Sequence, residues 1–247
     1  MGQSRHPVRL RAAVVQICLA GAALQAGSVA EALTPGGDLT VTSDYIFRGI
    51  SESAGQPAAQ ADLHLSTRDG TFVGAFVSTL RKINQHGADF ELEEYLGHRF
   101  DLSPLWSTAL TAVNYSYLAR NIPFSNDYQE LSASLSYLDL GTLSFSYSPN
   151  AVRYAAGYRL GRYAAYVTDA SAQIPLVGRL FATGGVGYYT LTGPDGSSYA
   201  YGNGGLAFEY KAWRIDAAYY VTQIRSQYLF PYGEARNRFA VTVSWHF

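Results

Sequence analysis

The chain has 247 residues and a formal net charge of −1, from 18 Lys and Arg against 19 Asp and Glu. This mild and mixed charge argues against nucleic acid as a partner, and the one cysteine, Cys18, leaves neither a disulfide nor a zinc–thiolate site. The 20 Tyr, 12 Phe and 24 Gly favour strands and tight turns over helices.

Residues 1–30 have the layout of a secretory signal peptide. Three arginines precede an apolar run that is too short to span a bilayer, and small residues follow it. Cleavage is expected after Ala30, or as late as Ala32. Because Cys18 lies inside the apolar run, the mature chain has no cysteine. We expect residues 31–247 to form a single domain.

The stretch after the signal peptide alternates with a period of two, which is typical of a strand with two unlike faces. Asp38–Arg48 is the first predicted strand, with Asp44 and Arg48 on its polar side. A charge that faces lipid at mid-depth costs on the order of 2–4 kcal/mol, so these two residues are expected in a barrel lumen or near an interface. A second strand is predicted to begin near Pro57. A third, over Thr71–Leu80, is apolar on both faces, so its orientation stays open.

Short motifs in this region carry a family resemblance. They are Ser43–Ser51, Gln56–Ala58 with Gln60, and Gly70–Gly74. These motifs resemble the opening of the TorF-type porin family, which was formerly catalogued as a proteobacterial domain of unknown function (Gcw_chp). Over residues 38–247 the resemblance is one of strand layout. It implies an outer-membrane barrel more firmly than it implies transport.

The middle of the chain alternates in the same way. Asp89–Phe100 has leucines on one face, but Glu94 and His98 interrupt that face. Trp106–Leu118 ends in tyrosines, which suit the aromatic girdle at a bilayer interface. Glu130–Ser148 is predicted as a hairpin with serine at every second position, which is typical of a small, wet lumen face.

The segment Asn150–Gly161 has no clear period, and a helix, a loop and an irregular strand all stay open for it. The strands expected after it are Arg162–Ile174, Arg179–Leu191, Tyr199–Lys211, Trp213–Thr222 and Arg238–Phe247. The total is about twelve, an even number as in single-chain bacterial barrels, with ten or fourteen as the alternatives. The predicted fold is therefore all-β, a single antiparallel transmembrane β-barrel of the outer-membrane type.

The last predicted strand presents a continuous apolar face made of Phe239, Val241, Val243, Trp245 and Phe247. An exposed apolar stripe on a soluble protein invites aggregation, whereas in a barrel it meets outer-membrane lipid. The pattern resembles the assembly signal of bacterial outer-membrane barrels, so the barrel-assembly machinery is an expected partner. The alternative is an edge strand of a secreted β-sandwich.

No pattern predicts an enzyme, a metal site or a bound cofactor. His64 and Ser66 share a strand face, but catalysis also needs an acid and an oxyanion hole, so a polar pair in the wall is favoured. Glu91 and Glu93 are spread along a strand instead of curled around an ion, and the histidines lie far apart.

Charged residues of both signs are instead expected to line the lumen. The candidate pore-lining residues are Asp44, Arg48, Asp62, Glu91, Glu93, Arg99, Glu130, Arg179, Glu209, Arg214, Asp216 and Arg238. Facing rows of opposite charge would tune the ion selectivity of a pore, whereas close pairing of the same charges would plug it.

The sequence therefore favours a porin in the outer membrane of a Gram-negative bacterium, which passes small polar solutes or ions by diffusion. The alternative is a non-conducting outer-membrane barrel with a structural or adhesion role. An outer-membrane hydrolase and a soluble secreted sandwich are disfavoured. The sequence does not name the solute, and it leaves open whether the protein is a homo-oligomer.

Overall fold

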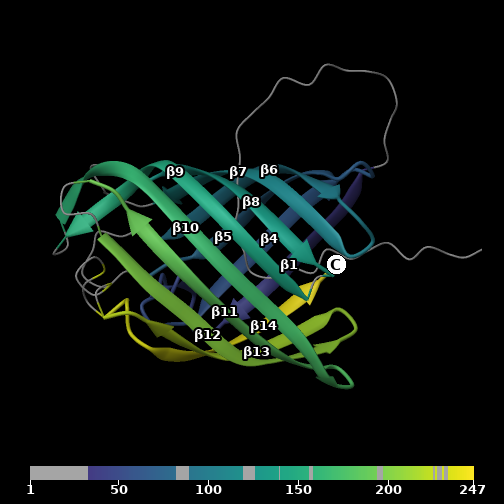
Figure 1. The fold of residues 1–247 in the computed structure, drawn as a ribbon. Coiled ribbons are helices and arrows are strands. Elements are labelled where there is room, and N and C mark those ends of the chain that lie inside the picture. The colour runs from purple at the N-terminus through teal and green to yellow at the C-terminus, as the bar shows by residue number, and fades with distance from the viewer. Residues whose placement is uncertain are drawn as a thin grey trace, which may run out of the picture.

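Twelve strands close into an antiparallel barrel in the computed structural model (Figure 1). The structure describes residues 33–81, 89–118, 126–138, 140–155, 158–193, 197–224, 226, 230 and 233–247. The predicted signal peptide and Cys18 lie outside the described residues. No helix in the described ranges is long and apolar enough to cross a membrane.

Each barrel strand pairs with the next one along the chain, and the last pairs with the first. The strands are β1 (Thr34–Thr42), β4 (Ala58–Ser66), β5 (Thr71–Thr79), β6 (Phe90–Asp101), β7 (Trp106–Leu118), β8 (Tyr128–Tyr137), β9 (Gly141–Ala155), β10 (Tyr158–Val177), β11 (Leu180–Leu191), β12 (Ser197–Tyr210), β13 (Trp213–Thr222) and β14 (Arg238–His246). The expected count of about twelve is confirmed. The carboxy-terminus lies at the barrel end that holds the short turns (Figure 1).

Alternation along each strand places apolar side chains outside and polar ones inside. On β14, Phe239 and Phe247 are exposed on the outer face, while Ala240 between them is buried. All five residues of the expected assembly signal share this outer face, because they occupy every second position. Near the short turns, outward aromatic rings lie close together, with Trp106 4.9 Å from Tyr137 between ring centroids. Such a ring of aromatics is typical of a membrane interface.

One local expectation is wrong. The first strand was expected to run to Arg48, but β1 ends at Thr42 and the chain then leaves the wall.

Of the three alternatives left open for Asn150–Gly161, the described residues show the irregular strand. The segment contains the end of β9 and the start of β10, whose pairing shifts register between Arg159 and Gly161 and again between Tyr163 and Ala165. These irregularities break the period of two, which is why the sequence pattern was unclear there.

The orientation of Thr71–Leu80, which the sequence left open, is settled by the structure. Val73 and Val77 are exposed on the outside, whereas Phe76 packs inside against a cluster that contains Tyr45. The wall therefore has an apolar exterior on this strand too.

The outer face can be tested at Val243, which pairs with Val41 on one side and Ile215 on the other. Val243→Arg should lower the free energy of unfolding in phosphatidylcholine vesicles by about 2–4 kcal/mol, because a guanidinium would face lipid near mid-depth. Val243→Thr, which keeps the shape of the side chain, is the control. Equal losses for the two variants, measured by urea titration of tryptophan fluorescence, would contradict an outward Val243.

Candidate functional site

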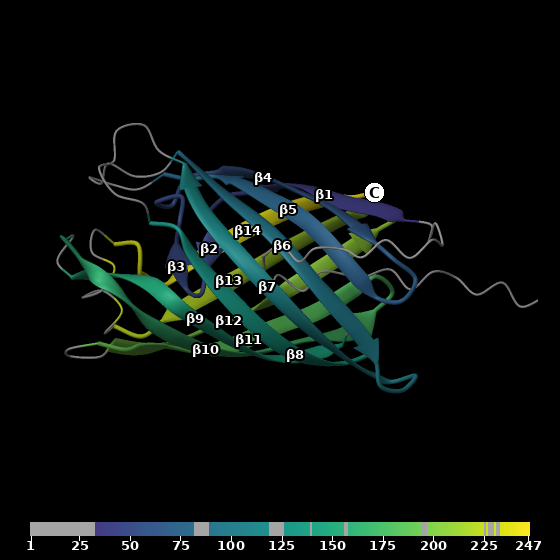
Figure 2. The same ribbon diagram turned by 90° about the horizontal axis from the view of Figure 1, so that it is seen from above.

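The connection between β1 and β4, residues 43–57, folds into the barrel and is called the lumen hairpin below. It carries two short strands, β2 (Ile46–Phe47) and β3 (Ile50–Ser51), which pair with each other and not with the wall. Figure 2 shows β2 and β3 between the walls, near the end opposite the short turns. Ile50 is 2% exposed and Ser51 is 0% exposed, so β3 is buried inside the barrel.

The tip of the lumen hairpin is the turn Arg48-Gly49. Both residues have positive φ, 50° and 77°, as a two-residue hairpin of type I′ requires. A Cβ atom on Gly49 would lie 2.5 Å from the Thr222 hydroxyl oxygen and 2.7 Å from the Cβ of Tyr201. The Thr222 hydroxyl donates a hydrogen bond to the Gly49 carbonyl (2.6 Å). Glycine is therefore needed for both the turn and the close approach to the wall.

Arg48 ties the tip to β8. Its guanidinium donates two hydrogen bonds to the carboxylate of Glu130, at 2.8 and 2.7 Å. The two side chains are 10% and 1% exposed, so the pair is largely removed from water. Burial by itself would lower the pKa of Arg48, but the charge of Glu130 and the hydrogen bonds to it hold that pKa well above its ordinary value. The guanidinium also lies 4.6 Å from the centre of the Phe47 ring.

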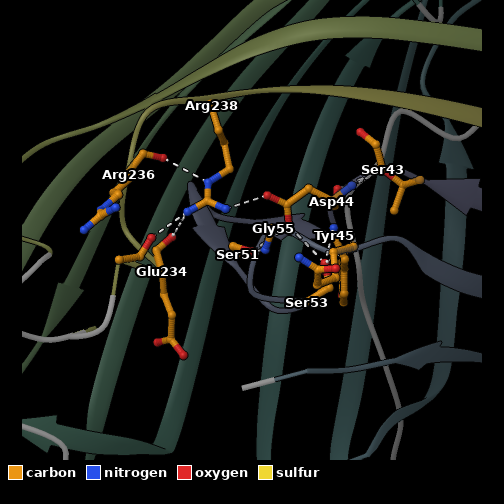
Figure 3. A network of polar contacts seen from close by, with 12 residues as sticks. Ser43, Asp44, Tyr45, Ser51, Ser53, Gly55, Glu234, Arg236 and Arg238 are labelled. Atoms are coloured by element: carbon orange, nitrogen blue, oxygen red, sulfur yellow. Dashed lines mark hydrogen bonds and ion pairs between the residues drawn. The ribbon is translucent and has the colours of Figure 1, made fainter. Parts of the chain in front are cut away.

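Asp44 ties the base of the hairpin to β14 (Figure 3). Arg238 donates to Asp44 Oδ2 at 2.6 Å, while the hydroxyls of Ser51 and Ser53 lie 2.6 and 2.9 Å from Oδ1. Arg238 also donates to the carbonyl of Gly233, at 2.6 Å. The carboxylate is thus neutralised by a cation and closed in by hydroxyls, as a buried charge requires.

These two anchors lie on opposite walls. In the ring of twelve strands, β8 and β14 are six steps apart, which is half of the circumference. The lumen hairpin therefore crosses the whole bore, with an ion pair at each end. The lumen hairpin with its two ion pairs is called the bridge below. Four of the predicted pore-lining residues form these ion pairs, namely Asp44, Arg48, Glu130 and Arg238.

A second set of predicted residues lies on β4 and β6 and takes no part in the two anchors. The Tyr95 hydroxyl donates to Asp62 at 2.7 Å, and His64 Nδ1 lies 2.9 Å from the same carboxylate. Glu91 accepts a hydrogen bond from the Tyr117 hydroxyl at 3.0 Å, and Glu93 is buried on the same face of β6.

The remaining predicted residues lie near the short turns. Arg214 bridges Glu209 (2.7 Å) and Asp216 (2.8 Å) inside the barrel. Arg99 pairs with the exposed Asp101 at 3.0 Å. Arg179 lies in the turn between β10 and β11, with its guanidinium 4.6 Å from the centre of the Tyr210 ring, outside the bridge. The twelve candidates therefore do not form one ring.

The structure places no catalytic pair at His64 and Ser66. The Ser66 hydroxyl donates to the Thr34 carbonyl (3.4 Å), while His64 contacts Asp62. Within the described residues, no group of three or more His, Asp or Glu side chains is placed to hold a metal ion.

Sequence reasoning missed the partners that make the bridge. Ser51, Ser53 and Thr222 hold the lumen hairpin, and Tyr115 packs beside its tip. The one local signal for the hairpin is the Arg48-Gly49 dipeptide, because glycine in a two-residue turn allows the strand to reverse.

The sequence from residue 26 to residue 247 matches the model of a family described as "Bacterial protein of unknown function (Gcw_chp)". The chain is a member of the Gcw_chp family. No curated protein matches the sequence.

Solved structures with a similar fold include two porins. A rhombohedral crystal form of the NanC porin is 9% identical, covers 84% of this chain and 97% of its own, and superposes with a TM-score of 0.55. The KdgM porin in complex with disordered oligogalacturonate is 10% identical, covers 86% of this Gcw_chp protein and 99% of its own chain, and has a TM-score of 0.51. At these identities the likeness shows the barrel fold alone.

The bridge predicts an asymmetric response to single substitutions. Arg48→Ala should lower the free energy of unfolding by about 3–5 kcal/mol, because it leaves the buried Glu130 carboxylate without its cation. Replacing both members together, Arg48→Met with Glu130→Leu, should cost far less.

The matched control is Arg99→Ala, whose partner Asp101 is 76% exposed, so the loss should stay below about 1 kcal/mol. Urea unfolding in lipid vesicles measures all three variants. Equal losses for Arg48→Ala and Arg99→Ala would contradict a larger stabilising role for the buried Arg48–Glu130 pair.

Proposed function

We propose that this Gcw_chp protein is an outer-membrane porin of Gram-negative bacteria that lets small polar solutes or ions diffuse through its lumen. The closed barrel with an apolar exterior supports a place in the membrane. The likeness to the NanC and KdgM porins supports a channel architecture. The resemblance of Ser43–Ser51 to TorF-type porins points the same way.

The observation that carries the proposal is the lumen hairpin. On this proposal, the chain segment that enters the bore and is tied to both walls narrows the path without blocking it. Solutes would pass beside the lumen hairpin, which would set the narrowest part of the bore. The paired charges at Arg48 and Asp44 would hold the constriction at a fixed width, because each is locked by a buried partner.

A second candidate function is a non-conducting barrel with a structural or adhesion role. It is favoured by the same hairpin, because a segment whose strand β3 is buried inside the bore can serve as a plug. Oligogalacturonate is bound by the KdgM porin and is not proposed as a solute of this protein.

Single-channel conductance in a planar bilayer separates the two candidates. The wild type should give discrete, reproducible steps. The double variant Arg48→Ala with Glu130→Ala frees the far end of the lumen hairpin, so it should give larger or noisier steps. Arg68→Ala, in an exposed turn between β4 and β5, should leave the step size unchanged. A wild type that is silent but folded, as judged by its gel shift on boiling, would refute the porin and support the plug.

A further inference from the structure

Four polar side chains form a hydrogen-bonded row on the outside of the barrel. Glu94 on β6, Asn114 on β7, Gln129 on β8 and Asn150 on β9 are called the outer polar row below. The Asn114 amide donates to Glu94 (3.1 Å), the Gln129 amide donates to Asn114 (2.7 Å), and the Asn150 amide donates to Gln129 (2.7 Å). Four neighbouring strands are thus joined by side chains across their outer face.

The outward direction of Glu94, Asn114 and Gln129 follows from their neighbours along each strand. Asn150 joins them at the register shift of the β9–β10 pairing, through its hydrogen bond to Gln129. Glu93 and Glu130, next to Glu94 and Gln129, are buried in the lumen. Leu131, two residues after Gln129 and therefore on the same face, is 58% exposed. The row therefore lies on the face that the rest of the barrel covers with apolar side chains.

The depth of Glu94 can be judged from β6. Its outward residues begin and end with exposed aromatics, Phe90 and Phe100. Ten residues of a strand tilted by about 40° rise about 25 Å, which is the height of the apolar band of an outer-membrane barrel. Glu94 lies four residues from Phe90, so it sits about 10 Å inside the band, with Leu92 and Leu96 on either side. Acyl chains at this depth offer no hydrogen bonds.

The row also keeps hydrogen-bonding capacity for a partner. The Asn114 amide is fully used, because it donates to Glu94 and to the Ser116 hydroxyl (3.1 Å each) and accepts from Gln129. In the described part of the chain, Gln129 and Asn150 each use one side-chain amide N–H, and Glu94 uses one carboxylate oxygen. An amide carries two N–H donors as well as an acceptor oxygen, so it can pair with an identical group. A lipid tail can satisfy none of these groups, whereas a protein surface can.

From this surface we infer that the outer polar row is the contact between two copies of this chain in the membrane. Both copies share one orientation in the bilayer, so their two-fold axis runs along the membrane normal, and the same patch faces itself. The row is inclined because the strands are tilted, so the two rows cross near the axis. A crossing at Gln129 brings the remaining amide N–H of each copy toward the Gln129 carbonyl of the other and keeps the two Glu94 carboxylates apart. This inference depends on the barrel spanning a bilayer, and not on its conducting.

Disulfide cross-linking in native outer membranes tests the contact. Full-length protein with Cys18→Ser carries no other cysteine. Ala112→Cys places a thiol on the outer face of β7, two residues from Asn114, and leaves the row intact. Oxidation should convert this variant into a covalent dimer. The control is Ala217→Cys, on the outer face of β13, which is six steps from β7 around the ring. It should stay monomeric.

A second pair of variants separates the contact from folding. Asn114→Leu and Gln129→Leu, each added to Ala112→Cys, should lower the cross-linked fraction about tenfold, the effect of a loss of roughly 1.4 kcal/mol. Both should still show the gel shift of a folded barrel, because an outward leucine suits lipid. Equal cross-linking at Ala112→Cys and Ala217→Cys would overturn the inference. So would a monomer in native nanodiscs, with or without a bound glycolipid.

Discussion

Closure of the sheet is the constraint on which the rest of the molecule depends. A strand in a bilayer must pair on both edges, because lipid offers no hydrogen bonds to a free edge. The last link of the ring, between β1 and β14, is also its shortest, with register pairs only from Asp38↔His246 to Thr42↔Thr242. Two hydrogen bonds between Gly37 and Phe247 extend it toward the short turns, and one from Ser43 to Val241 ends it on the other side.

The β1–β14 pairing is short because the chain leaves the wall to form the lumen hairpin. Beyond Ser43 the chain turns inward, so β14 loses its neighbour at Arg238, where the hairpin's first anchor lies. Arg238 therefore holds the hairpin base at the point where the wall loses its backbone pairing. Arg238, Ser51 and Ser53 all donate to the Asp44 carboxylate, because a buried charge needs several polar partners. The backbone hydrogen bonds that β14 lacks at this point are offset by the polar contacts between Arg238 and Asp44 inside the barrel.

Alternation along the chain predicted the strands, their number of about twelve and the outer face of β14, and the signal peptide and the family resemblance turned these strands into a barrel prediction. Strands such as Trp106–Leu118 and Trp213–Thr222 were predicted to the residue, because each face of a strand carries one kind of side chain. The lumen hairpin was not predictable in this way, because Asp44 and Arg48 keep the period of two after the strand has ended. What decides their place is contact with Glu130 and Arg238, which lie 82 and 194 residues away in the chain. A single sequence does not reveal pairings at such separations.

The interruption at Glu94 was visible in the sequence, but its partners were not, since Asn114 and Gln129 each look like ordinary polar residues near a strand end. Their placement links the outside of the barrel to its inside. Gln129 faces out in the polar row and Glu130, next to it, faces in to hold Arg48. Because neighbouring residues of a strand point to opposite faces, β8 cannot move at one of them without moving the other. β8 therefore carries part of the proposed contact with a second copy and also holds the far end of the lumen hairpin. A shift of β8 at that contact would move Glu130 directly, because Gln129 and Glu130 are joined by one peptide bond.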